Sequence, residues 1–219
     1  KGFYLGKYEV TQAQYEAVMT GNTDGLSATP SHWAGNPNRP VEKVSWNDVQ
    51  VFLQRLNNQQ SSDLPLGWRY VLPTEAQWEY ACRAGTSSAF SWGNTVTSLN
   101  ANFQSSGYSQ SVDVGQYNSN HWGFHDMHGN VFEWCFDFKG AYSVESEVDP
   151  IGPSSGVSRV RRGGSYANAA TSLRSAERNY GQSPDYRDAI QGLRLAYKQV
   201  SVPPSDLQSV SALTIVENQ

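Results

Sequence analysis

The amino-acid sequence predicts an α+β fold with much irregular structure, and three observations support this class. Three helices with capping signals are predicted within the first 84 residues, and the segment before them alternates apolar and polar side chains. From Gly85 onward the composition changes: Gly, Ser, Asn and Trp dominate, and apolar residues no longer recur at helical spacing over a long stretch. A chain of 219 residues is long enough for one domain with a substantial core.

The first predicted elements are a strand and a helix. Residues 1–10 have the alternating pattern of a half-buried strand. Thr11 and Gln14 then have the Thr-x-x-Gln spacing of a capping box, in which each side chain satisfies a backbone N–H at the start of a helix. Tyr15 and Val18 follow at helical spacing, so a helix is predicted to begin after Thr11.

Two further helices are predicted with the same kind of capping residue at the start, and no helix is predicted after them. Ser45 precedes a segment in which Val49 and Phe52 lie at helical spacing, and Thr74 precedes a helix that runs to about Ala84. Beyond it we expect loops and short strands held by aromatic packing. We therefore assign residues 1–200 to one domain and residues 201–219 to a C-terminal tail or edge strand.

The composition argues against several classes of partner. The formal net charge of −4 predicts no general attraction to nucleic acid or to anionic membranes. No apolar run approaches the roughly 20 residues that span a bilayer, and the opening residues have the pattern of a strand rather than of a signal peptide. The two cysteines, Cys82 and Cys135, form either one disulfide or two buried thiols.

Six ordered motifs span about residues 3–197: Tyr8 to Thr11, Pro40 to Trp46, Leu72 to Ala81, Gly129 to Trp134, Arg162 to Ser165 and Gly192 to Leu195. In order and spacing they resemble the formylglycine-generating enzyme family, which is also called the sulfatase-modifying factor family. The resemblance implies a variant of the C-type lectin fold, with two helices, small sheets and long ordered loops. It also includes a diversified branch, the variable proteins of diversity-generating retroelements, which use this scaffold to bind ligands.

The residues that the resemblance would assign to catalysis are absent. The family oxidises a substrate cysteine with oxygen, and its two thiolates hold a soft copper ion or exchange with the substrate thiol. These thiolates follow the Gly-Gly-Ser motif, where this chain has Asn168 and Leu173, and no cysteine follows Cys135. We therefore expect neither copper binding nor formylglycine formation, and we interpret Cys82 and Cys135 as scaffold residues.

The resemblance also implies a calcium ion bound by oxygen atoms, the ligands that this hard cation prefers. One family site is built from loop carbonyls and one carboxylate. Carried over to this chain, its ligands are the carbonyls of His128, Gly129 and Val131 and the side chain of Glu133. In the alternative interpretation, Glu133 is the buried partner of an arginine.

A second calcium site of the family is weakened or lost in this chain. Its ligands would be the Asn102 side chain, the carbonyls of Phe103 and Tyr108, and an aspartate, but Ser106 stands at the aspartate position. We expect one calcium ion in total.

Two other clusters leave alternatives open. His121, His125 and His128 are spaced as on one helical face, which would suit zinc or iron, but they also suit an ordinary loop. The late arginines would form either an anion-binding face or bridges between loops, and we favour the bridges. They are Arg159, Arg161, Arg162, Arg174, Arg178, Arg187 and Arg194.

The segment between Ser165 and Gln191 predicts a recognition surface. Most of its residues are Ser, Tyr, Asn, Ala, Thr, Gly or Asp, a mixture that resembles antibody contact surfaces. Motifs of the scaffold flank it, and tolerant loops between rigid anchors are typical of binding sites. We expect an exposed face over residues 166–190, with tyrosine anchors and polar contacts supplied by Tyr166, Asn168, Ser172, Asn179, Tyr180, Gln182 and Tyr186.

These patterns together favour a non-catalytic domain that binds a protein or glycan ligand, and an extracytoplasmic or cell-surface location would suit it. Two alternatives remain. One is a sulfatase-modifying oxidase-type enzyme, against which the missing cysteines argue. The other is a structural module of a cell-envelope complex.

Overall fold

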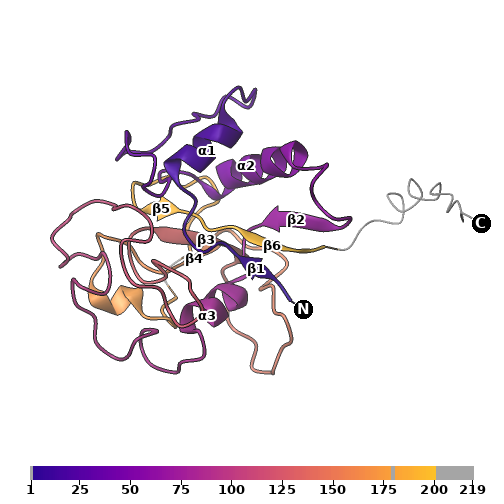
Figure 1. Cartoon of the computed structure of the whole chain (residues 1–219). Coiled ribbons are helices and arrows are strands. Elements are labelled where there is room, and N and C mark those ends of the chain that lie inside the picture. The colour runs from indigo at the N-terminus through magenta and orange to yellow at the C-terminus, as the bar shows by residue number, and fades with distance from the viewer. Residues whose placement is uncertain (1, 179–180, 201–219) are drawn as a thin grey trace, which may run out of the picture.

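A computed structural model describes residues 2–178 and 181–200 of the chain. All three predicted helices are present (Figure 1): α1 (Gln12–Met19), α2 (Trp46–Gln59) and α3 (Glu75–Arg83). Each begins with a complete capping box, formed by Thr11, Ser45 and Thr74 with the side chain three residues later. These local signals therefore fix the helix starts.

The strands form two three-stranded sheets. In the first, β6 (Ala196–Gln199) lies between β1 (Tyr4–Leu5) and β2 (Trp68–Val71), and both pairings are antiparallel. In the second, β3 (Phe132–Phe138) lies between β4 (Arg159–Arg162), which is antiparallel to it, and β5 (Gln191–Gly192), which is parallel. The mixture of helices and sheets confirms the α+β class.

The strand predicted over residues 1–10 is much shorter in the structure, where, of the described residues 2–10, only Tyr4–Leu5 pairs as a strand. The backbone after it makes isolated hydrogen bonds instead. Gly6 N–H donates to the Leu195 carbonyl at 2.8 Å, and Val10 N–H donates to the Leu193 carbonyl at 2.9 Å. The expected alternation of burial holds over residues 2–5 only, because Lys7 and Tyr8 are both exposed and Glu9 and Val10 are both buried.

Strand β3 lies between two of the three clusters of buried apolar residues that the structure describes, with α1 and α2 on one side and α3 on the other (Figure 1). Successive side chains of a strand point to opposite faces. Trp134 accordingly packs with the residues of α1 and α2, whereas Cys135 packs with Trp78 and Cys82 of α3. Both cysteines are buried free thiols, so of the two alternatives the structure shows the thiols.

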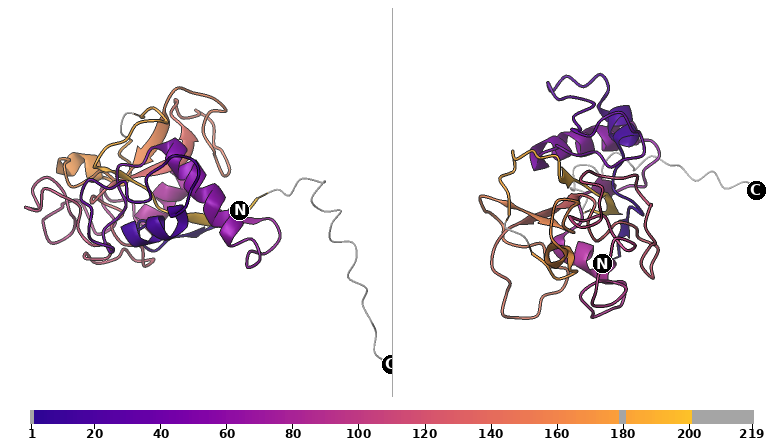
Figure 2. Two further views of the ribbon diagram at one scale, coloured as in Figure 1. Left: turned by 90° about the horizontal axis from the view of Figure 1, so that it is seen from above. Right: turned by 90° about the vertical axis from the view of Figure 1, so that its left-hand side faces the viewer.

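Long irregular segments fill the remainder of the molecule (Figure 2), as the composition after Gly85 predicts. The one short helix described there is η1 (Ala170–Leu173). Among the described residues, no helix has the length and apolar character that a bilayer crossing requires. The tail or edge strand assigned to residues 201–219 lies outside the described residues.

Candidate functional site

The segment predicted to form a recognition surface begins at a tight reversal of the chain. Gly163 and Gly164 have φ values of +94° and +76°, which side chains other than glycine rarely adopt. A Cβ atom on Gly164 would lie 2.9 Å from the carbonyl oxygen of Ser172. The close approach of two backbone segments therefore fixes where the surface starts.

The two residues that the family resemblance matches to the enzymes' thiols have structural roles in this chain. The Asn168 amide oxygen accepts a 2.6 Å hydrogen bond from the Ser165 hydroxyl, and its carbonyl accepts the Gln104 N–H. Leu173 is fully buried at the end of η1, where it packs with Phe90, Ala101 and Phe103. Neither side chain binds a soft metal ion or exchanges with a thiol.

Tyr166 does not serve as the exposed anchor that the sequence predicted, because only 7% of its surface is accessible. Its N–H donates to the Asn130 carbonyl, and its hydroxyl accepts a 3.0 Å hydrogen bond from the Trp33 indole N–H. The prediction for Tyr166 is therefore wrong. Sequence reasoning missed Trp33, which lies in a distant loop without any local signal.

The remaining predicted contact residues are half-buried or undescribed. Asn168, Ser172, Gln182 and Tyr186 are half-buried, and Asn179 and Tyr180 lie outside the described residues. The exposed positions between them are mostly small. They are Ala167, Ala169, Thr171, Arg174, Ala176, Ser183, Asp185 and Arg187. We call these eight positions, with the half-buried residues between them, the 167–187 surface.

The far end of the 167–187 surface is tied to the start of α2. Arg187 forms an ion pair with Asp48 at 2.5 Å, and Asp185 accepts a 2.6 Å hydrogen bond from Asn47. The Asn47 N–H also donates to the Pro184 carbonyl at 3.1 Å. The far end of the surface is thus held by α2, whereas the sequence pointed to the motif from Gly192 to Leu195 as the anchor on that side.

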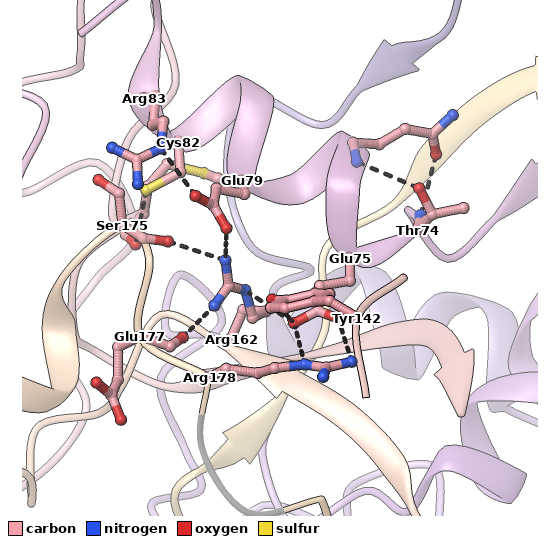
Figure 3. A network of polar contacts seen from close by, with 12 residues as sticks. Thr74, Glu75, Glu79, Cys82, Arg83, Tyr142, Arg162, Ser175, Glu177 and Arg178 are labelled. Carbon is pink, nitrogen blue, oxygen red and sulfur yellow. Dashed lines mark hydrogen bonds and ion pairs between the residues drawn. The ribbon is translucent and has the colours of Figure 1, made fainter. Parts of the chain in front are cut away.

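A buried polar network holds the middle of this segment against α3 (Figure 3). Arg162 is fully buried between Glu79 and the carbonyls of Ser175 and Glu177, to which it donates hydrogen bonds. Arg178 pairs with Glu75 at 2.7 Å. These guanidinium groups bridge loops and a helix, which is the role that we favoured for the late arginines.

Two more arginines lie on aromatic rings rather than at an open anion site. The Arg159 guanidinium lies 3.4 Å from the Phe138 ring centroid and 3.8 Å from that of Trp46. Arg161 lies 4.2 Å from the Phe132 centroid. Cation–π contacts of this kind stabilise the second sheet.

The comparisons with known proteins agree with this architecture. The sulfatase-modifying factor enzyme 1-like domain matches residues 1–199. The chain belongs to this family. The formylglycine-generating enzyme of Streptomyces coelicolor is 34% identical over 189 residues, which cover 73% of this chain and 56% of that enzyme. The chain therefore spans little more than half the length of this relative.

Solved structures of family scaffolds superpose on most of the chain. Treponema denticola variable protein 1 has a TM-score of 0.78 at 30% identity, and the match covers 89% of this chain and 84% of that protein. PvdO from Pseudomonas aeruginosa has a TM-score of 0.73 at 26% identity, with 90% and 80% covered. The formylglycine-generating-enzyme-like fold expected from the motifs is thereby confirmed.

The carboxylate that the family resemblance assigns to calcium is fully engaged with protein groups. Both oxygens of Glu133 contact the Arg194 guanidinium, at distances from 2.7 to 3.2 Å, and one also accepts the Trp78 indole N–H at 2.6 Å. Both members of the ion pair are buried. The geometry thus suits the alternative interpretation, a buried partner of an arginine, and Glu133 so placed does not fit a calcium ligand.

The Asn102 side chain and the Phe103 carbonyl, which the resemblance assigns to the second calcium site, are likewise engaged. The Asn102 amide oxygen accepts a 2.7 Å hydrogen bond from Ser106, and the Phe103 carbonyl accepts the Ser106 N–H. Ser106 thus donates to the groups that would face a cation. Tyr108 lies at the surface, where its hydroxyl accepts a hydrogen bond from Gln116.

A melting experiment tests calcium binding directly. An ion that binds only the folded state raises the melting temperature as its concentration increases. Because Arg194 already neutralises Glu133, we expect the same melting curve in calcium and in chelator. A calcium-dependent rise that Glu133→Gln removes would restore the family's site at residues 128–133.

The histidines predicted as an alternative metal site do not share a helical face, because residues 121–131 contain no helix. His128 donates from Nδ1 to the Leu173 carbonyl at 2.7 Å, and its Nε2 accepts the Ser91 N–H at 3.1 Å. Burial lowers its pKa to about 4, so the ring is neutral at pH 7 with both nitrogens used. Within residues 2–178 and 181–200, no group of three His, Cys, Asp or Glu side chains is placed to hold a metal ion.

Proposed function

We propose that this domain is a non-catalytic binding module, which recognises a protein or glycan through the 167–187 surface. One observation carries the proposal. The motifs that build the scaffold are retained, whereas the positions of the enzymes' thiols hold a hydrogen-bonded Asn168 and a buried Leu173. A scaffold kept without its reactive groups supports a role in binding rather than in thiol oxidation.

The chemistry of the 167–187 surface also supports recognition. Its exposed side chains are mostly alanine, serine and threonine, which fill no core space and can be replaced without creating a cavity. Their backbone is anchored at Gly164 and at the start of α2. Likeness to a protein named variable protein 1 supports a further proposal, that these positions differ among close relatives of this chain.

The enzyme alternative draws its support from the formylglycine-generating enzymes among the relatives. The chain has no cysteine after Cys135, and burial raises the pKa of Cys82 to about 12. A thiol with so high a pKa is a poor nucleophile at neutral pH. The cysteine content of the chain therefore favours the binding proposal over the enzyme alternative.

A capture experiment with matched variants tests the proposed surface. The wild-type domain is used to capture proteins and glycans from the surface fraction of its native source, and the captured species are identified. Thr171→Arg with Ser183→Arg places two bulky charges on the 167–187 surface. We expect this variant to lose the captured ligand and to keep the wild-type melting temperature, because both side chains are exposed.

The control variant carries Gln54→Arg with Asn58→Arg, two exposed positions on α2. It adds the same charge away from the 167–187 surface. Capture that survives in the first variant, or that is lost equally in both variants, would contradict the proposal.

A further inference from the structure

A cleft of about 790 Å³ lies along α3, beneath the loop that follows β3. Sites for small ligands and side chains commonly have volumes of roughly 300–1,000 Å³. Among the described residues of the 167–187 surface, Ala176 and Arg178 line the cleft. Part of its wall is the polar network of Figure 3, which includes Glu75, Glu79, Tyr142 and Arg178.

The lining of the cleft has more carboxylates than cations to pair with them. Glu75 pairs with Arg178, Glu79 pairs with Arg83 at 2.8 Å, and the buried Arg162 behind the wall of the cleft pairs with both glutamates. Asp137 and Glu147 line the same cleft, and the structure describes no ion pair for either of them with any residue of 2–178 or 181–200.

Asp137 is the most unusual of these groups, because it is only 3% exposed. One of its oxygens accepts the Glu75 N–H at 2.8 Å, at the start of α3. Arg178, Arg159 and Lys198 attract this carboxylate, but none of them is within ion-pair distance of it. A cation that entered the cleft and contacted Asp137 directly would stabilise its charged form.

The aromatic residues of the cleft are also suited to a cationic ligand. Tyr80 and Tyr142 are each 63% exposed, although both line it. The Arg178 guanidinium lies 4.2 Å from the Tyr142 ring centroid while it pairs with Glu75. The chain's own arginine thus shows how a guanidinium is held here between a carboxylate and a ring.

We propose that this cleft binds the guanidinium or ammonium group of a basic side chain on a peptide partner. Asp137 and Glu147 supply the opposite charge, and Tyr80 supplies the ring face. This inference does not depend on the 167–187 surface, and each of the two sites has its own variants.

The test uses the peptide acetyl-Gly-Arg-Gly-amide and its matched neutral form with citrulline in place of arginine, titrated into the whole domain by isothermal calorimetry. We expect the arginine peptide to bind and the citrulline peptide not to bind. Asp137→Asn keeps an oxygen for the Glu75 N–H and should weaken binding by about tenfold, because a charge-assisted contact is lost. Glu147→Gln, at an exposed position, should weaken it by about two- to threefold.

The dependence on pH gives an independent readout. Burial raises the pKa of Asp137 to about 6, so its carboxyl group is neutral below that pH and charged above it. Binding of the arginine peptide should therefore weaken as the pH falls from 7 to 5 in the wild type. The same change should be small in Asp137→Asn.

Glu145→Gln is the matched control, because Glu145 is exposed on the same loop and does not line the cleft. It should bind the arginine peptide as the wild type does. Equal binding of the citrulline peptide, or unchanged binding in both Asp137→Asn and Glu147→Gln, would overturn the inference. Neither result would bear on the 167–187 surface, since Thr171→Arg and Ser183→Arg lie outside the cleft.

Discussion

Replacing Arg194 by methionine is expected to destabilise the fold by about 3–5 kcal/mol, the range for breaking a buried ion pair by removing one partner. Arg194 is fully buried and pairs with Glu133. It also donates to the carbonyls of Gly6 at 3.0 Å and His125 at 2.7 Å. Methionine would leave a buried carboxylate and two carbonyls without these donors. Denaturant unfolding measures the loss.

Two comparisons keep this prediction specific. Arg69→Met removes an exposed guanidinium whose one described hydrogen bond goes to the neighbouring Trp68 carbonyl, so it should change stability little. Adding Glu133→Leu to Arg194→Met removes the stranded charge and should recover part of the loss. If Arg194→Met costs no more than Arg69→Met, the ion pair does not organise the core.

Gly129→Ala is expected to destabilise the domain by about 3 kcal/mol or more, from strain and overpacking together. Gly129 has a φ of +103°, and a Cβ atom there would lie 2.2 Å from the Asn102 carbonyl oxygen and 3.1 Å from Leu173. The oxygen belongs to the backbone and cannot swing aside as a side chain would. The loss should appear as a lower melting temperature.

Gly123→Ala separates the two sources of that loss. Gly123 has a similar φ of +88°, but a Cβ atom there would meet nothing within 4 Å. It should therefore carry the strain of about 1–2 kcal/mol without the clash. Equal losses in the two variants would show that the approach of Gly129 to Asn102 is not as close as described.

The parts of the fold that the sequence predicted are those with local signals. Each helix start depends on two side chains three residues apart, such as Thr74 and Gln77, and all three are confirmed. Strands β1 and β6 illustrate the opposite case, because Tyr4 pairs with Tyr197 at the far end of the domain. An alternating pattern shows that a segment is extended but does not show how much of it finds a partner.

The site was harder to predict for the same reason. Tyr166 has the composition of a contact residue, yet Trp33 binds its hydroxyl across 133 positions of sequence and holds it inside. Burial of Asp137 beside the cleft likewise depends on the loop after β3, which no periodicity places. The composition indicated a segment of small, polar side chains that can be replaced without unfolding the domain. Which of these side chains are exposed to solvent depends on tertiary contacts.

The measurement that tests the central claim most directly is an assay for formylglycine formation. The domain is incubated with copper, oxygen and a peptide that carries the sulfatase motif, and the peptide is followed by mass spectrometry. The formylglycine-generating enzyme of Streptomyces coelicolor serves as the positive control. Since no cysteine follows Cys135, we predict that the peptide keeps its cysteine. Conversion of that cysteine to an aldehyde that depends on this domain would contradict a purely binding role.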